Sequence, residues 1–247
     1  MIVAFADLDD TLFQTRRKLR GDEGELTPAT LNRQGQPHSV QTPDQAALYA
    51  LLTANATLIP VTGRDRAAMQ RVTLPFTSWQ ILDHGFTMLE PGGMVHQPWA
   101  TRMVAHLQPL QDALTAAHAS ALKLVDELGC QLQLHHVHDA PFMLVAKHPQ
   151  ADAGALARVQ DHWAAEMVGT PLHVIANANN VSVLPLAPGK LGAVKYLLEK
   201  IFPDAVLTLG LGDSVSDLAF MNACHYALTP SRGQLLRAAT ACGLPQR

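Results

Sequence analysis

Three carboxylates stand close together near the start of the sequence. In the stretch MIVAFADLDDTLF, an apolar run leads into Asp7, Asp9, Asp10 and then Thr11. Residues two apart in an extended chain point to the same side and lie within roughly 7 Å, so the carboxylates of Asp7 and Asp9 repel each other unless a positive charge lies between them. A polar turn that ends a buried strand is the alternative interpretation, because Asp is common in turns.

Three further polar segments occupy similar positions along the chain. Thr62, Gly63 and Arg64 follow an apolar run, Lys190 stands at the start of an expected helix, and the segment GLGDSVSD contains Asp213 and Asp217. In open α/β sheets, ligands bind beyond the carboxyl ends of the strands. We therefore expect these segments to converge with Asp7 on one site.

The chemistry that suits these residues is phosphoryl transfer. A phosphate monoester carries up to about two negative charges and needs a cation to approach a cluster of acids. The carboxylates of Asp7 and Asp213 and the backbone carbonyl of Asp9 are oxygen ligands of the kind that Mg²⁺ prefers. Lys190 supplies a second positive charge, and Thr62 offers a hydroxyl for the phosphoryl oxygens.

The elements expected around these residues indicate an α/β fold with a doubly wound parallel sheet. Strand, helix and strand over residues 1–6, 45–54 and 57–61 form a parallel βαβ unit. Further framework elements are expected as a helix over 191–200, a strand over 205–210, a helix from 217, a short strand over 225–228 and a final helix from 233.

The middle of the chain follows a different pattern. The expected elements there are a long helix over 101–128, strands over 131–138 and 141–148, a helix over 152–167, and strands over 172–177 and 181–186. A self-contained α+β block inside a βα framework indicates an inserted domain. We therefore predict a discontinuous core, residues 1–84 and 187–247, with an inserted cap over residues 85–186.

A long polar segment separates the first strand from the first helix. Residues 14–44 are rich in Gly, Pro, Gln and Thr and exceed an ordinary connection in length, so they are expected to form a flap over the site. The flap contains Arg16, Arg17, Lys18 and Arg20. These side chains either form a solvated face, as charge runs usually do, or meet an anionic substrate.

The ordered set DLDDT, Thr62 of VTGR, Lys190 and GDSVSD resembles the motifs of the haloacid dehalogenase superfamily of phosphohydrolases. The resemblance implies that Asp7 is the nucleophile that forms an aspartyl-phosphate and that Asp9 is the general acid and then the base. It further implies that Thr62 and Lys190 hold the phosphoryl group and that Asp213 completes the metal site. Asp217 is then either a metal ligand or an orienting residue.

Other residues of these motifs are expected to contact the phosphate. They are Thr11, Gly63 and Arg64, although an Arg at the start of a helix also pairs readily with a nearby carboxylate. Two positions depart from the family's usual pattern: Asp10 replaces the frequent Gly of DxDGT, and Ser216 stands where Asn is usual in GDxxND.

The αββαββ order of the insertion resembles the C2-type cap that is shared by Cof-like phosphatases, sugar-phosphate phosphatases and phosphomannomutases. Such a cap closes over the site and selects the substrate. Three cap histidines, His135, His136 and His138, stand beside Asp139. They allow either a zinc site or a cap-sheet face, and the former lacks the usual zinc-ligand spacing.

Composition excludes several other classes of function. Hydrophobic residues make up 48% of the 247 residues and charged residues 16%, which is typical of a globular protein. A formal net charge of -3 with only 5% aromatic residues argues against nucleic acid or an anionic membrane as a partner. The three cysteines are widely spaced, no signal-like segment opens the sequence, and no apolar stretch approaches the roughly 20 residues of a membrane span, so we expect a cytoplasmic protein.

The sequence thus predicts an enzyme, a Mg²⁺-dependent phosphatase acting on a small soluble phosphate monoester such as a sugar or glycosyl phosphate. A phosphomutase shares DxDxT and this cap type, and a non-catalytic sensor of a phosphate ligand would keep the same fold. Metal-independent dehalogenation is a weaker alternative, because it needs neither Asp9 nor Asp213.

Overall fold

Two separate β-sheets organise the chain in the computed structural model, which describes residues 1–19, 21, 24–176 and 179–241. One compact unit comprises residues 1–96 and 190–247, and the other comprises residues 97–189. The division by contacts thus falls at 96/97 and 189/190. The boundaries expected from the sequence, 84/85 and 186/187, stay a prediction about independently folding domains.

The first unit contains a four-stranded parallel sheet in the order β13-β12-β1-β5. Its strands are β1 (Ile2–Ala6), β5 (Thr57–Pro60), β12 (Leu207–Leu211) and β13 (Tyr226–Leu228). Ala6 of β1 lies opposite both Leu211 of β12 and Pro60 of β5. Three strands therefore end at one edge, and the segments that begin at Asp7, Val61 and Gly212 leave the sheet side by side.

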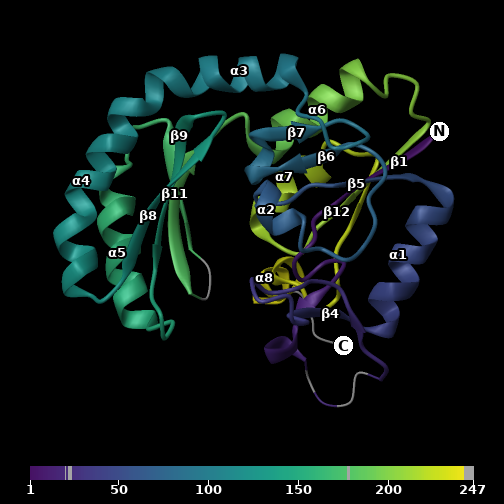
Figure 1. Ribbon diagram of the computed structural model, residues 1–247, viewed down its shortest axis with the longest axis horizontal. Coiled ribbons are helices and arrows are strands. Elements are labelled where there is room, and N and C mark those ends of the chain that lie inside the picture. Colours follow the sequence, from purple (N-terminus) through teal and green to yellow (C-terminus); the bar gives the residue numbers. More distant parts are fainter. Residues whose placement is uncertain (20, 22–23, 177–178, 242–247) are drawn as a thin grey trace. The chain divides into compact units, whose positions relative to one another are not determined.

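Helices lie on both faces of this sheet, as Figure 1 shows. Helix α1 (Pro43–Asn55) lies on one side, and α6 (Gly189–Lys200) and α7 (Leu218–Met221) lie on the other. Right-handed crossovers require this arrangement, because the chain moves outward from β1 to β5 and then returns across the sheet to β12 and β13. The predicted doubly wound α/β core is confirmed.

Several short elements complete the first unit. They are α2 (Arg66–Met69), β6 (Gln80–Leu82), the 3-10 helix η2 (Asp83–Gly85), β7 (Thr87–Leu89), the 3-10 helix η4 (Val215–Asp217) and α8 (Gln234–Ala241). The helix expected from Asp217 is thus only a 3-10 turn followed by one α-helical turn.

The segment expected as a polar flap folds into a small antiparallel sheet in the order β2-β4-β3. Its elements are β2 (Gln14–Thr15), the 3-10 helix η1 (Arg16–Lys18), β3 (Thr27–Pro28) and β4 (Ser39–Gln41). The flap closes on itself, because Gln14 pairs with Val40 and the side-chain amide of Gln41 donates to the Leu12 carbonyl at 3.0 Å. Arg20 lies outside the described residues.

Helix α1 begins where the flap ends. Thr42 and Gln45 form a capping box, in which the Thr42 N–H donates to the Gln45 side-chain oxygen at 3.1 Å. Pro43 occupies the first turn, where its missing N–H costs nothing. The sequence therefore fixes the start of this helix.

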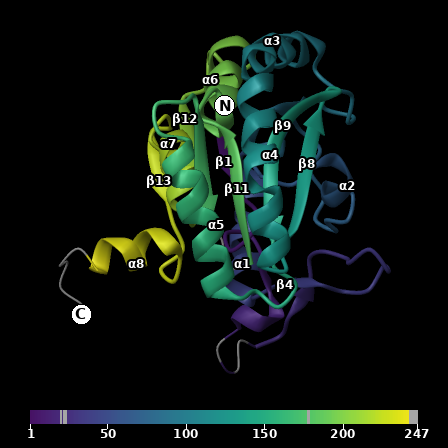
Figure 2. The same cartoon turned by 90° about the vertical axis from the view of Figure 1, so that its left-hand side faces the viewer.

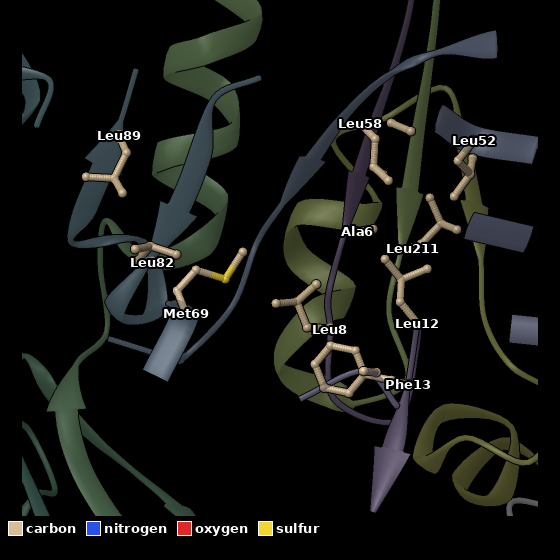
Figure 3. Packing of buried hydrophobic residues seen from close by; sticks show 12 residues of the cluster. Ala6, Leu8, Leu12, Phe13, Leu52, Leu58, Met69, Leu82, Leu89 and Leu211 are labelled. Carbon is tan, nitrogen blue, oxygen red and sulfur yellow. The ribbon is translucent and has the colours of Figure 1, made fainter. Parts of the chain in front are cut away.

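The hydrophobic core of the first unit surrounds β1. Val3 to Ala6 are fully buried, as expected for a central parallel strand. Figure 3 shows Leu8, Leu12 and Phe13 just beyond that strand, packed in the same cluster as Leu211 and Leu52. The turn that carries the acids is therefore anchored by its apolar residues, which leaves its carboxylates to point elsewhere.

The second unit has the predicted αββαββ order. Its elements are α3 (Gln97–Leu107), the 3-10 helix η3 (Gln108–Leu110), α4 (Gln111–Glu127), β8 (Gln131–Val137), β9 (Ala140–Lys147), α5 (Ala153–Glu166), β10 (Leu172–Ala176) and β11 (Asn180–Pro185). The strands form an antiparallel sheet in the order β10-β11-β9-β8. Helices α4 and α5 pack together against this sheet, as Figures 1 and 2 show.

One helix of this unit differs from expectation. The single helix predicted over 101–128 is divided by η3, which contains Pro109. Proline lacks the N–H that an uninterrupted helix would use and clashes with the preceding turn. The apolar stripes remain intact, since Trp99 of α3 and Leu114 of α4 are both buried.

Candidate active site

A buried ammonium group joins two of the predicted acids. Asp7 follows β1 directly, and its N–H donates to the Leu211 carbonyl at 2.8 Å. Lys190, in the first turn of α6, donates from Nζ to Asp7 Oδ1 and to Asp217 Oδ1, each at 2.7 Å. The three residues are 7%, 9% and 0% exposed. The structure therefore brings together residues that lie 183 positions apart in the chain.

Asp217 is held from its other side as well. Its Oδ2 accepts hydrogen bonds from the Ser214 N–H at 3.1 Å and from the Ser214 hydroxyl at 2.7 Å. Gly212 makes room for it, because a Cβ at position 212 would lie 2.4 Å from the Asp217 Cβ. Asp217 also contributes one oxygen to the group of three acids with metal-binding geometry, so both roles expected for it, metal ligand and orienting residue, stay predictions.

The acids in this cluster outnumber its cations. One oxygen from each of Asp7, Asp213 and Asp217 lies within 4.8 Å of the others. Burial raises the pKa of Asp7 to about 8, with Lys190 opposing and Asp217 and Asp9 adding to the rise. Burial also raises the pKa of Asp213 to about 6, helped by the charges of Asp10 and Asp217.

These raised pKa values fit a site for a divalent cation. A cation between Asp7 and Asp213 would stabilise both carboxylates in their charged forms. The donor set consists of hard oxygens, which suit a cation of the Mg²⁺ type. Burial by itself would lower the pKa of Lys190, but Asp7 and Asp217 outweigh it and raise that pKa, so the ammonium stays charged.

Asp9 lies in a different environment. Arg64 binds it with two hydrogen bonds, from Nε to Oδ2 and from Nη2 to Oδ1, each at 2.7 Å. The Asp9 side chain is 48% exposed and that of Arg64 is 18% exposed. The guanidinium also lies 5.1 Å from the centre of the Phe13 ring. Of the two contacts expected for Arg64, the structure thus contains the one to a carboxylate.

Thr62 and Gly63 form the loop that carries Arg64. Thr62 is 1% exposed, and its Oγ1 accepts the Arg64 N–H at 3.2 Å. The loop rests on η2, since the N–H groups of Asp83 and His84 donate to the carbonyls of Arg64 and Thr62 at 2.9 and 3.0 Å. This support fixes the backbone N–H groups beyond β5 that the sequence assigned to phosphate.

His84 is a neighbour of this loop that the sequence did not single out. Its φ is 55°, and that of Asp83 is 50°, so two consecutive non-glycine residues adopt the left-handed region. A Cβ at Gly63 would lie 2.5 Å from the imidazole ring of His84. Gly63 is therefore required for the close approach of the ring, a signal that only the three-dimensional structure provides.

Asp10 and Thr11 complete the turn after β1. Asp10 has φ of 64°, a conformation that glycine adopts freely and that Asp tolerates better than most residues. This geometry explains why glycine suits the position, and Lys18 of the flap forms an ion pair with the added carboxylate. The Thr11 hydroxyl is buried and has no hydrogen-bond partner among the residues that the structure describes.

The other candidate residues do not form a site. Among residues 1–19, 21, 24–176 and 179–241, the group of Asp7, Asp213 and Asp217 is the one cluster of His, Cys, Asp and Glu with metal-binding geometry. The zinc alternative for the cap histidines thus lacks geometric support in the described part of the chain. Cys130 and Cys224 are free thiols, and Cys242 lies outside the described residues.

Comparison with known proteins places this arrangement in a known fold. No protein-family model matches the chain, and no curated protein matches its sequence. Solved structures do match over nearly its full length. The sucrose-phosphatase of Synechocystis, solved with sucrose and phosphate, is 20% identical with a TM-score of 0.60, and the match covers 99% of this chain and 88% of that one.

The chain has the fold of the haloacid dehalogenase-like hydrolases with a C2-type cap. A haloacid dehalogenase-like hydrolase from B. subtilis matches with 12% identity and a TM-score of 0.53, over 97% of this chain and 92% of that one. The C-terminal domain of trehalose-6-phosphate phosphatase from C. albicans matches with 15% identity and a TM-score of 0.58, over 100% of this chain and 78% of that one. None of the helices in the described ranges has the length and apolarity to cross a membrane.

Proposed function

We propose that this protein is a Mg²⁺-dependent phosphatase that hydrolyses a small phosphate monoester through an aspartyl-phosphate on Asp7. The observation that carries the proposal is the buried contact between Lys190 and Asp7, with an Asp213 oxygen within 4.8 Å of one of Asp7. A nucleophilic carboxylate beside a fixed ammonium group and a cation site is suited to attack on a doubly charged phosphate.

In the first step, a carboxylate oxygen of Asp7 attacks phosphorus and the bond from phosphorus to the leaving oxygen breaks. Asp9 donates a proton to that oxygen, so that the product leaves as a neutral alcohol. Lys190 stays charged throughout and neutralises part of the charge on the phosphoryl group.

In the second step, water attacks the phosphorus of the aspartyl-phosphate. Asp9 accepts a proton from that water, the bond from phosphorus to the Asp7 oxygen breaks, and inorganic phosphate leaves. Asp7 is then restored as a carboxylate, and Asp9 is again protonated for the next cycle. The same side chain thus serves as acid and then as base.

The remaining residues position the phosphoryl group. Thr11, Thr62 and Gly63 supply hydroxyl and N–H donors to its oxygens, while Arg64 holds Asp9 through Nε and Nη2. The Mg²⁺ would be held by the carboxylates of Asp7 and Asp213 and the backbone carbonyl of Asp9, where it supplies charge neutralisation for the phosphoryl oxygens. Asp217 orients Lys190, as its two contacts indicate.

A sugar phosphate is the class of substrate that we favour. Two of the similar structures are a sucrose-phosphatase with sucrose and phosphate and a trehalose-6-phosphate phosphatase domain. A soluble phosphorylated metabolite also agrees with the proposed cytoplasmic location. The cap, with its antiparallel sheet and two helices, is the part that we propose selects among such molecules.

The direct test is phosphate release from a panel of phosphorylated metabolites and p-nitrophenyl phosphate, with Mg²⁺ and with a chelator. We expect release that depends on the metal and is lost in Asp7→Asn, while the exposed control Asp204→Asn retains it. Full activity of Asp7→Asn would overturn the nucleophile assignment. Formation of a bisphosphorylated sugar without free phosphate would instead identify a mutase, and binding of a phosphate analogue without turnover would identify a sensor.

A further inference from the structure

We propose that the first unit carries a second anion-binding subsite beside the acidic cluster, so that the preferred substrate bears a carboxylate or second phosphate besides the ester that is cleaved. This inference rests on the proposed phosphatase function and narrows its substrate class.

The subsite is a cavity of about 720 Å³ within the first unit. It lies between the turn after β1, the flap, the start of α1 and the segment that joins β13 to α8. Its volume is within the range of cavities that bind small molecules.

The cavity reaches the proposed reaction centre. Asp213 lies in its wall, and a carboxylate oxygen of Asp213 lies within 4.8 Å of one of Asp7. Asp10 and Thr11, which follow the proposed nucleophile in sequence, also line it. One small molecule can therefore present its ester phosphate to Asp7 and extend its other end into this cavity.

The cavity wall contains more basic side chains than its acids pair with. Four cationic residues line the cavity, namely Arg17, Lys18, Arg232 and Arg237. Lys18 is used by Asp10. Neither Arg17 nor Arg237 forms an ion pair with any residue in the described part of the chain.

The acids of the wall leave Arg17 and Arg237 unpaired. Asp10 pairs with Lys18, and Asp44 accepts a hydrogen bond from the Thr42 hydroxyl and keeps its charge, but it forms no ion pair with these arginines in the described part of the chain. Asp213 belongs to the proposed metal site, where the cation balances its charge. Two guanidinium groups therefore remain to receive an anion, and Arg is well suited to bind carboxylate or phosphate through paired N–H donors.

The test compares matched substrates that differ by one anionic group. Suitable pairs are glucose 6-phosphate with 6-phosphogluconate, glycerol 3-phosphate with 3-phosphoglycerate, and a hexose monophosphate with its bisphosphate. We expect a higher kcat/KM for the member with the extra anion, through a lower KM. The first two pairs test a carboxylate and the third tests a phosphate, so they distinguish the two sources of the charge.

The variants are Arg17→Gln, Arg237→Gln and both together. We expect each single change to reduce the preference for the anionic member by about tenfold or more, while kcat/KM on the neutral member and on p-nitrophenyl phosphate stays unchanged. The control is Arg33→Gln with Lys200→Gln, which removes two charges from exposed positions outside the cavity wall. Equal losses of preference in both double variants would mean that the overall charge of the protein causes the effect, which would overturn the proposal.

A binding measurement separates this inference from the proposed function. Calorimetric titration of Asp7→Asn with 3-phosphoglycerate and with glycerol 3-phosphate needs no turnover. Tighter binding of 3-phosphoglycerate that is lost in the added Arg17→Gln and Arg237→Gln changes supports the subsite, even where hydrolysis is absent. Hydrolysis of p-nitrophenyl phosphate without any preference within the substrate pairs and without differential binding would leave the phosphatase in place and overturn the subsite.

Discussion

Two carboxylates that stand two residues apart occupy opposite environments. Asp7 is buried against the ammonium of Lys190, in a cluster that has more acids than cations. Asp9 is half exposed and is bound on one side by the planar guanidinium of Arg64. Both acids follow the end of β1, so the difference between them comes from the residues that each contacts and from how deeply each is buried.

This difference in environment agrees with the different roles proposed for Asp7 and Asp9. A buried carboxylate with a fixed cationic partner keeps one position and one direction of attack, which suits a nucleophile. A half-exposed carboxylate is accessible to a leaving group and to water, which suits an acid and base. Separate environments for two acids are a general means of giving them separate roles, and the predictions below test whether that separation holds here.

The largest effect is expected from Lys190→Met. This change leaves Asp7 and Asp217 buried without their cation, so the free energy of unfolding should fall by about 3–5 kcal/mol. Phosphate release should fall by about 10²- to 10³-fold, as when a fixed donor to a developing charge is removed. Denaturant unfolding and single-substrate kinetics measure both. Lys195→Met, an exposed position of the same helix, is the control, and equal losses there would contradict the special role of Lys190.

Asp9→Asn should act on chemistry and hardly on stability. Without an acid, release from alkyl phosphates should slow by about a hundredfold. The loss should be much smaller for p-nitrophenyl phosphate, whose leaving group needs no proton. The free energy of unfolding should change by no more than about 1 kcal/mol, because the Arg64 pair is largely exposed on the Asp9 side. A uniform loss across leaving groups would remove Asp9 from the role of acid.

Asp83 is a buried carboxylate that forms no ion pair with any described residue, and it tests what burial alone does. Burial raises its pKa from 3.8 to about 6, with Asp65 adding and a hydrogen bond with Thr87 opposing. Between those values the folded state binds more protons than the unfolded state. Stability therefore falls as the pH rises through that window and stays lower above it.

Asp83→Asn removes this penalty, and Asn also tolerates the left-handed backbone. We expect the variant to be more stable than the wild type by about 1–3 kcal/mol at pH 8, and to gain little at pH 4. Denaturant unfolding at the two pH values measures the difference, with Asp204→Asn as an exposed control. A gain of the same size at both pH values would show that titration of Asp83 is not its cause.

The smallest effect concerns Asp10, whose backbone conformation matters more than its charge. Asp10→Gly and Asp10→Ala both remove the pair with Lys18, but only glycine adopts φ of 64° without strain. Asp10→Ala should therefore be less stable than Asp10→Gly by about 1 kcal/mol. Equal unfolding midpoints for the two variants would mean that the turn relaxes to another conformation.

Much of the fold follows from local sequence pattern. The apolar run before Asp7 predicts a buried strand, and in the structure its register against β12 brings Asp7 and Asp213 to one edge. The αββαββ order of the second unit follows from periodicity and turn residues. The sequence contains Pro109, but the apolar stripe continues on both sides of it. The pattern therefore predicts one uninterrupted helix.

The details of the site depend on contacts that sequence does not reveal. Whether Arg64 faces phosphate or a carboxylate depends on the position of Asp9, which lies 55 residues away in the chain. The ring of His84 approaches Gly63 because η2 adopts left-handed backbone angles, which no residue of Asp-His-Gly other than the glycine favours. The bridge from Lys190 to Asp217 likewise arises only when α6 and η4 meet.

The closed base of the flap sets how freely that segment can vary. Gln14 pairs with Val40, so the flap begins and ends at nearly one place. The entropy of closing such a loop grows only with the logarithm of its length, at about 0.6 kcal/mol for each doubling. Ala29 and Thr30 are fully buried, and the Ala29 carbonyl accepts the Thr73 N–H at 2.9 Å, so this part of the flap is fixed to the rest of the first unit. The exposed turn over residues 33–37 can be shortened, extended or exchanged at small cost to folding, while Asp7 and Lys190 stay where they are. That turn is therefore the part of the flap in which sequence changes are tolerated most readily.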